Sequence, residues 1–333
     1  MTPIADPPAR FSRRRALAVL AAAGATLLTG RPARAAPARW EWRGHAMGAD
    51  ARLILLHPDP SVAREAASAC AAEIARLEAE FSLFRADSAL SRLNRLGYFD
   101  RPGHDLLRLL AEALDFARRT DGAFDPTVQP LWELYAGHFA RGPGAGPPPR
   151  EAIAAATAVV GWRRVAVSAE KITLAPGTRL TLNGIAQGYI TDRVADVLRA
   201  FGFGNVLIDL GEARALGAGP EDAPWSVGIA ERSGDPALFR MLMENCALAV
   251  SAPAGTVFEP SGRWHHLFDP ATGMPASPWR LVAVRTTDAT TADALSTALA
   301  VSPPERGRMI LRAHPGAKAW GINEEGALRP VVG

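Results

Sequence analysis

Short apolar strand candidates alternate with segments of helical period along most of this 333-residue chain, and this pattern limits the folds it can adopt. The apolar run at 52–56 predicts a buried strand, and the helical spacing of apolar residues over 62–81 predicts an amphipathic helix. Because hairpin-like strand pairs occur beside strand–helix alternation, we predict an α+β fold, with mixed sheets flanked by helices in a single compact domain. The further predicted helices are 106–119, 184–201, 290–300 and 305–313, and the further predicted strands are 206–210, 225–229, 247–251 and 281–286.

The composition is that of a globular protein without a disulfide framework. Hydrophobic residues make up 48% of the chain and charged residues 21%. Its two cysteines, Cys70 and Cys246, belong to no CxxC motif and to no Cys/His cluster with zinc-site spacing. Cys70 falls on the apolar face of the predicted helix 62–81, which indicates a core thiol. The fold must therefore rest on its hydrophobic core.

Residues 1–35 have the layout of a secretory signal. Three arginines at 13–15 follow a serine, an uncharged run of 13 residues spans 16–28, and a small-x-small sequence ends at Ala35. The run is too short to cross a bilayer, which takes about 20 residues. Paired arginines after a serine resemble the twin-arginine signal, whose pathway exports folded proteins. We expect a periplasmic mature chain, residues 36–333, with no transmembrane segment; an uncleaved tail is the alternative.

The net charge of +3 does not indicate a nucleic-acid partner. Residues 1–35 hold six arginines and one acid, so the remaining chain carries a net charge of about −2. That remainder has only two lysines, Lys171 and Lys318, and no arginine-dense block of the kind that binds a phosphate backbone.

Several enzyme classes are excluded because their motifs are absent. The sequence has no GxGxxG after a strand, no Walker loop, no GxSxG elbow and no HExxH. Rossmann dehydrogenases, P-loop enzymes, serine hydrolases and zincins are therefore poor candidates.

Three local features carry possible site chemistry. On the predicted helix 290–300, Asp293 and Thr297 are four residues apart and share a face, so their oxygens suit a hard cation such as Mg²⁺. An aspartate near a helix start is also an ordinary cap or solvated charge.

The second feature is the pair His265 and His266, followed by Asp269 in a Pro and Thr-Gly turn. Adjacent histidines on an extended segment point opposite ways, so one of them can face a given site. Asp269 could orient that imidazole for proton transfer, while a structural histidine beside a turn is the alternative.

The third feature is a glycine-containing turn at 183–188. A strand is expected to enter this turn and a helix to leave it from Gly184, with Asn183 as the N-cap. Free N–H groups at the helix start would seat a phosphate oxygen, although a plain tight turn explains the pattern equally well.

Taken together, these features resemble the FAD:protein FMN transferases, also called the ApbE-like family. The resemblance runs from Met47 almost to the carboxyl end. The matching blocks are Met47-Gly48, 84–88 with 91–94, 122–128, 183–188, Pro224-Trp225, 265–270 with Thr272-Gly273, and Ala292-Asp293 with 296–298.

The resemblance implies an ApbE-like fold and an enzyme that splits FAD, joins FMN to a threonine or serine hydroxyl of an acceptor flavoprotein, and releases AMP. The acceptor would carry a Ser/Thr flavinylation motif and can belong to a membrane electron-transfer system. Carried over by position, the Mg²⁺ ligands would be the Gly184 carbonyl, the Asp293 carboxylate and the Thr297 hydroxyl, with Ser296 as a neighbour.

The resemblance also assigns catalytic and flavin positions. His266 matches the histidine that takes the acceptor proton, with Asp269 in its neighbourhood. The positions that match FAD contacts are Met47, Phe84, Ala123, Phe124, Asp125, Thr181 and Gln187.

This chain departs from the family pattern at several places. Many members have Asp at the position of Thr181 and Lys or Glu at the position of Gln187, and the common GGD is here Gly211-Glu212-Ala213. We interpret these differences as those of a subgroup variant. The alternatives are an exported flavin-binding protein without transferase activity and an FAD pyrophosphatase.

Overall fold

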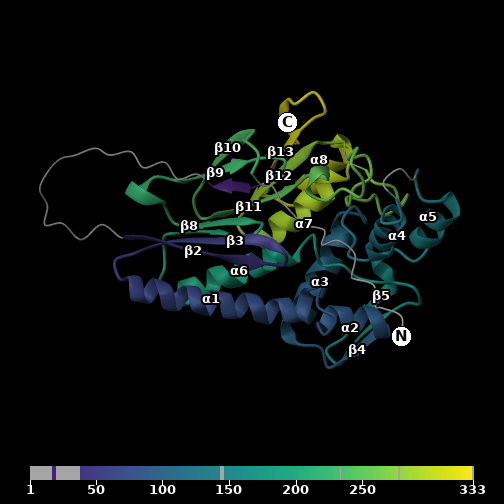
Figure 1. The fold of residues 1–333 in the computed structure, drawn as a ribbon, viewed down its shortest axis with the longest axis horizontal. Helices are drawn as coiled ribbons and strands as arrows, with labels where there is room; N and C mark the ends of the chain where they lie inside the picture. Colours follow the sequence, from purple (N-terminus) through teal and green to yellow (C-terminus); the bar gives the residue numbers. More distant parts are fainter. Residues whose placement is uncertain (1–16, 20–37, 143–145, 233, 277, 332–333) are drawn as a thin grey trace, which may run out of the picture.

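An eight-stranded antiparallel sheet forms the centre of the molecule in this computed structural model, which describes residues 17–19, 38–142, 146–232, 234–276 and 278–331 (Figure 1). Every neighbouring strand pair in it is antiparallel. The order across the sheet is β14 (Leu328–Pro330), β13 (Lys318–Ile322), β12 (Leu281–Thr286), β11 (Cys246–Ser251), β8 (Ala213–Leu216), β7 (Val206–Asp209), β3 (Ala49–His57) and β2 (Ala38–Ala46).

Two three-stranded antiparallel sheets accompany the large one. One contains β1 (Leu17–Val19), β9 (Trp225–Ile229) and β10 (Phe239–Met243), and the other contains β4 (Tyr98–Asp100), β6 (Lys171–Leu174) and β5 (Val165–Val167). Strand β1 falls within the predicted signal peptide, most of which lies outside the described residues, so that signal remains a prediction.

The period-two pattern of the strands gives the large sheet two apolar faces. In β3, Leu53 and Leu55 belong to the main core with the helices, whereas Ile54 belongs to a second cluster with β9 and β10. Among the helices that supply buried residues to the main core are α1 (Pro60–Phe81), α6 (Ala186–Ala200) and α7 (Ala289–Ala300). Figure 1 shows α1 and α6 on one side of the sheet and β9 and β10 on the other.

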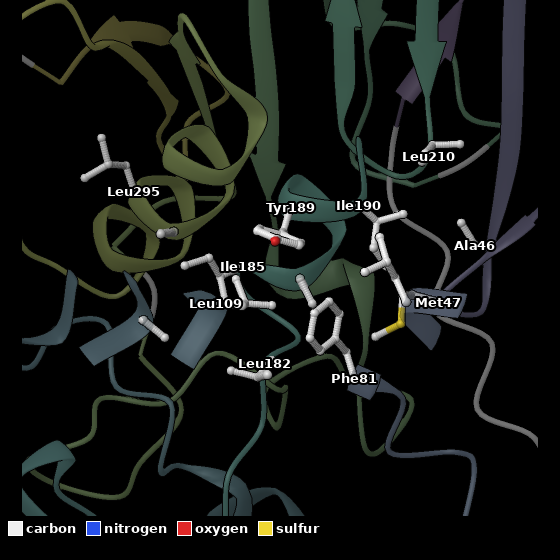
Figure 2. Packing of buried hydrophobic residues seen from close by; sticks show 14 of the residues in the cluster. Ala46, Met47, Phe81, Leu109, Leu182, Ile185, Tyr189, Ile190, Leu210 and Leu295 are labelled. Carbon is white, nitrogen blue, oxygen red and sulfur yellow. The ribbon is translucent and has the colours of Figure 1, made fainter. Parts of the chain in front are cut away.

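Helix α6 lies at the middle of the main core. Its Tyr189 ring meets the Phe81 ring of α1 edge to face, with the centroids 5.7 Å apart. Ile185, just before the helix, and Met47, just after β2, are buried in the same cluster (Figure 2). The predicted core thiol Cys70 is fully buried in this cluster, on α1.

Five further helices complete the described structure. They are α2 (Ala89–Leu96), α3 (His104–Arg119), α4 (Gln129–Phe139), α5 (Arg150–Thr157) and α8 (Pro304–Arg312), with short 3-10 turns at Trp162–Arg164, Pro220–Asp222 and Pro253–Gly255. None of the helices that the structure describes combines the length and apolar character that a bilayer span requires.

The predicted α+β class and the predicted elements outside the signal segment are confirmed, apart from the approach to α6. That helix begins at Ala186, and Asn183 is not its cap: the cap position is Ile185, which makes no side-chain cap bond. The N–H groups of Ile185 and Ala186 both donate to the Leu182 carbonyl, so a tight turn replaces the first predicted helical residues. In place of the expected strand before the turn, the described chain has one isolated parallel bridge at Arg179.

Candidate active site

A cavity lies where the turn before α6, helix α7, the end of β11 and the loop after β11 meet. Four predicted site residues share its wall: Thr181, Gly184, His266 and Thr297. The complete lining of this His266 cavity is Val128, Trp132, Thr181, Asn183, Gly184, Glu231, Val250, Ser251, Ala252, Gly255, Thr256, His266, Leu267, Phe268 and Thr297.

The backbone of Gly184 lies directly against the Thr297 side chain. A Cβ added at Gly184 would stand 2.8 Å from Thr297 Oγ1, closer than real Cβ contacts, and 3.3 Å from Cε2 of Phe124, a tight contact. Glycine therefore lets the turn approach α7, and it brings two of the three predicted metal ligands together.

The third predicted ligand, Asp293, joins α7 to the first turn of α6. The fully buried Asp293 accepts a hydrogen bond at Oδ2 from the Gly188 N–H, at 3.0 Å. The two helices touch here, because a Cβ added at Gly188 would lie 2.2 Å from the Ala289 carbonyl oxygen. The turn before α6 and the Asp293–Thr297 face of α7, more than a hundred residues apart in the chain, thus converge.

The oxygen donors of these three residues fit a hard cation such as Mg²⁺. Among the described residues, no three His, Cys, Asp or Glu side chains gather as a metal-binding group, so a zinc-type centre has no ligands there. The expected set needs only one carboxylate, with a carbonyl and a hydroxyl beside it. Ligation of Mg²⁺ by Gly184, Asp293 and Thr297 remains a prediction.

Ser296 has a structural role beside this set. Its hydroxyl donates to the Asp293 carbonyl at 3.0 Å, and it lies 2.8 Å from the hydroxyl of Ser251 on β11. Because Ser296 is fully buried, these contacts anchor α7 to the sheet.

The expected phosphate seat at the start of α6 is largely occupied by the protein itself. The N–H groups of Ile185 and Ala186 donate to Leu182, and that of Gly188 donates to Asp293. The helix start therefore serves first to hold Asp293 in place.

His266 faces the cavity in a defined orientation. Its Nδ1 lies 3.1 Å from the Thr256 carbonyl oxygen, and its backbone N–H donates to the same oxygen at 3.1 Å. Because a carbonyl only accepts, the proton of the neutral imidazole sits on Nδ1 and Nε2 is left with its lone pair. A role for this ring as the proton acceptor remains a prediction.

The loop that carries His266 is anchored by an aromatic cluster. Tyr135 of α4 packs against the rings of Phe258, Trp264 and Phe268. The Tyr135 hydroxyl donates to the Gly273 carbonyl at 3.2 Å. These contacts hold both ends of the loop, and with them the position of His266.

The neighbouring histidine points to the other side of the chain, as expected for an extended segment. His265 lines a separate hollow and accepts a hydrogen bond at Nδ1 from the Leu267 N–H. Burial lowers the pKa of His265 to about 4, so this ring is neutral at physiological pH.

Asp269 makes its hydrogen bonds within its own turn. Its carboxylate accepts from the Ala271 N–H at 3.0 Å and from the Thr272 hydroxyl at 3.0 Å. The Thr256 carbonyl, and not this carboxylate, is therefore the group that holds His266 Nδ1. A catalytic role for Asp269 remains a prediction.

The predicted flavin positions fall into two groups around the turn before α6. Met47 is buried in the main core and its N–H donates to Glu78, whereas Phe84 is 58% exposed beside Gly48. Stacking of the Phe84 ring on a flavin remains a prediction.

The second group, Ala123 to Asp125, is buried. The Phe124 ring abuts Gly184 from behind, so it shapes the turn. The Asp125 carboxylate accepts from the Thr127 N–H and hydroxyl and from the Trp162 N–H, while burial raises its pKa. Its oxygens thus close a loop of the protein.

Thr181 and Gln187 flank the turn. The Thr181 hydroxyl accepts from the Asn183 N–H within the cavity wall. Gln187 is buried, its Nε2 donates to the Leu210 carbonyl at 3.3 Å, and its Oε1 has no partner among the described residues. Such a buried acceptor can take a hydrogen bond from a ligand.

Two site residues were missed at the sequence level. Thr256 acts through its backbone carbonyl, which every residue type carries, so no sequence signal marks it. Glu231 lines the cavity and pairs with Arg280 at 2.6 Å. The sequence signal for Glu231 was its position two residues after the predicted strand 225–229, because a polar residue at a strand end can reach a site at the edge of a sheet.

Comparisons with known proteins agree with this fold. The sequence model of the ApbE family matches residues 47–320 of this chain. The chain is 33% identical over 247 residues to an FAD:protein FMN transferase of Vibrio cholerae, covering 71% of this chain and 72% of the relative. It is 32% identical over 286 residues to an FAD:protein FMN transferase of Treponema pallidum, covering 77% of this chain and 76% of the relative.

The fold is also similar to those of solved ApbE structures. The ApbE protein of Thermotoga maritima aligns with a TM-score of 0.77 at 29% identity, covering 88% of this chain and 97% of that one. The flavinyl transferase ApbE of Pseudomonas stutzeri aligns with a TM-score of 0.76 at 26% identity, covering 89% and 96%. The chain therefore belongs to the ApbE family, and it is an enzyme of the FAD:protein FMN transferase kind.

Proposed function

We propose that this enzyme moves FMN from FAD to a serine or threonine hydroxyl of an exported acceptor flavoprotein, releases AMP, and depends on Mg²⁺. The observation that carries the proposal is the His266 cavity. There an imidazole whose Nδ1 is held by the Thr256 carbonyl shares one wall with Gly184 and Thr297.

The arrangement supports in-line phosphoryl transfer. The acceptor oxygen attacks the FMN phosphorus as its proton passes to Nε2 of His266, and the bond between that phosphorus and the bridging oxygen breaks. AMP leaves with the bridging oxygen, and FMN stays on the acceptor as a phosphoester. A hydroxyl needs such a base, because it is a poor nucleophile while protonated.

The oxygens of Gly184, Asp293 and Thr297 would hold the cation. A bound Mg²⁺ supplies positive charge against the phosphate oxygens, where negative charge is spread in the transition state. The chain fixes these oxygens in advance through the Gly188–Asp293 hydrogen bond and the glycine at 184. The unpaired Gln187 Oε1 supports a ligand beside the turn.

We further propose export by the twin-arginine route, which would place the mature enzyme in the periplasm. The order of residues 1–35, with arginines, an uncharged run and a small-x-small end, supports this location. A folded export substrate fits a protein whose site is assembled from distant segments.

One reaction tests the proposal. Residues 36–333 are incubated with FAD, Mg²⁺ and an acceptor domain with a Ser/Thr flavinylation motif, and mass spectrometry follows acceptor and nucleotides together. We expect the acceptor to gain the mass of FMN as AMP is released. His266→Ala should lower transfer at least about 100-fold, because general bases contribute about 10²- to 10⁴-fold.

Three outcomes would contradict the proposal. AMP release without a labelled acceptor would indicate an FAD pyrophosphatase. FAD binding without AMP release would indicate a binding protein. Full transfer by His266→Ala would show that the base lies elsewhere.

A further inference from the structure

A second hollow adjoins the His266 cavity on the opposite side of the His265–His266 segment. Its wall includes Arg232, Arg263, Arg280 and His265, together with Glu231 and Glu324, and we refer to it as the arginine hollow. Glu231 lines both the arginine hollow and the His266 cavity. The two hollows are therefore neighbours that share the wall residue Glu231.

Of the three arginines that line the arginine hollow, one forms an ion pair within the part of the chain that the structure describes. Arg280 is neutralised by Glu231, with Nη2 and Oε1 2.6 Å apart. Arg232 and Arg263 are exposed and form no ion pair among the described residues. Glu324 is the one other acid in the wall, so positive charge is in excess.

The Arg263 guanidinium is held in a preferred place. It lies over the Trp264 ring, 5.3 Å from the ring centroid, and Trp264 is itself buried. An arginine ordered in this way loses less side-chain entropy when it binds a carboxylate. His265 in the same wall is neutral, so it adds no charge to the hollow.

A protein acceptor that reaches His266 comes close to this hollow, because Glu231 lines both. Its hydroxyl has to reach His266, and the polypeptide on either side of that residue then runs over the rim of the cavity. Since an extended chain advances about 3.3 Å per residue, residues a few positions from the modified hydroxyl come to lie over the neighbouring hollow.

We propose that the arginine hollow binds an acidic stretch of the acceptor polypeptide next to the modified hydroxyl, through Arg232 and Arg263. This inference rests on the proposed function. Carboxylates are its preferred ligands because exposed arginines form bidentate hydrogen bonds with them while the acceptor docks and leaves.

The test uses the double variant Arg232→Glu/Arg263→Glu in residues 36–333. The matched control is Arg64→Glu, an exposed arginine on α1, a helix that contributes no residue to either wall. Two acceptor domains are compared, one with Asp and Glu beside its Ser/Thr motif and one with these changed to Asn and Gln. The acceptor KM, kcat and the Kd for FAD are measured for each pair.

We expect the double variant to raise the KM for the acidic acceptor about tenfold with kcat and the FAD Kd unchanged. With the neutralised acceptor, the double variant and the parent enzyme should have the same KM. An increase in NaCl from about 50 to about 300 mM should also remove the difference in KM, because exposed charges are screened. The control should match the parent enzyme.

Other results would overturn the inference. A weaker FAD Kd with an unchanged acceptor KM would assign the arginines to the nucleotide. Equal effects on both acceptors, or an equal effect of Arg64→Glu, would show a general charge effect. If the parent enzyme transfers FMN and the double variant behaves like the parent, the inference alone fails. If the parent enzyme transfers no FMN, the proposed function fails, and the inference fails with it.

Discussion

At the scale of single residues, the site depends on atoms that no sequence pattern identifies. Gly184 matters for the Cβ it lacks, and Thr256 for a carbonyl that any residue would supply. The histidine pair was readable in part: alternation along an extended segment predicted that only one ring would face the site, and His266 and His265 do line different cavities. Which carbonyl orients that ring could not be read, because the contact joins residues ten apart in an irregular loop.

Gly184→Ala should impair transfer more than it impairs folding. The added methyl would meet Thr297 Oγ1 at 2.8 Å and the Phe124 ring at 3.3 Å, so the turn must shift away from α7. We expect a loss of about tenfold or more in kcat/KM for FAD, with about 1–3 kcal/mol lost from the free energy of unfolding by overpacking. Steady-state kinetics and urea denaturation measure both. Gly137→Ala in α4, where nothing lies within 4 Å, is the control and should stay active.

His265 should make the fold sensitive to acid. Burial lowers its folded-state pKa to about 4 from 6.5, so the unfolded chain binds the proton more readily. The free energy of unfolding is therefore unaffected by this group above about pH 6.5. It falls as the pH drops toward 4, by at most about 3 kcal/mol. Urea denaturation at several pH values should show a shallower decline for His265→Gln, and an unchanged decline would refute this assignment. His45→Gln serves as the exposed control.

At the scale of elements, the contact of α6 with α7 assembles the expected metal ligands. Helical periodicity located α6, and α7 was predicted over 290–300 although most of its residues are buried and not one face alone. Their start points were less predictable: Asn183 has the chemistry of a cap, yet the Leu182 turn delays α6 until Ala186. Tertiary contact of the turn with α7 outweighs that local preference.

Two substitutions at Asp293 separate its structural role from its charge. Asn keeps an acceptor for the Gly188 N–H, so Asp293→Asn should unfold within about 1 kcal/mol of the parent, whereas Asp293→Ala leaves that buried N–H unpaired at a cost of about 1–3 kcal/mol. Both should lower transfer at least about 100-fold, because the carboxylate charge for Mg²⁺ is lost. Thermal unfolding and Mg²⁺ titration of transfer test this. Retained Mg²⁺ dependence with normal activity in Asp293→Asn would place the metal elsewhere.

At the scale of the whole molecule, the described residues from Ala46 onward form an extensive core. The buried clusters begin at Ala46, and their two faces enclose the large sheet between the helices and β9–β10. Strand β1 is the one described element that precedes the expected mature start, and it pairs only with β9.

Removal of residues 1–35 should therefore leave the fold and the activity intact. The loss of the short β1 pairing should change the unfolding midpoint by less than about 4 °C, the shift that about 1 kcal/mol gives a chain of this size. Differential scanning fluorimetry of residues 1–333 and 36–333, with transfer assays on both, measures this. A larger drop would show that β1 belongs to the stable fold and would argue against its removal as a signal.

The sequence by itself determined the local elements and the chemical character of the site, because periodicity and residue type are properties of short segments. The helix 62–81 with Cys70 inside it, and the oxygen face of Asp293 and Thr297, were readable in this way. Only the tertiary structure decided that Gly184 presses against Thr297, that Gly188 holds Asp293, and that a carbonyl of Thr256 orients His266. The first two contacts join parts of the chain more than a hundred residues apart, and the third joins two ends of an irregular loop, so none of them follows from the pattern of a short segment.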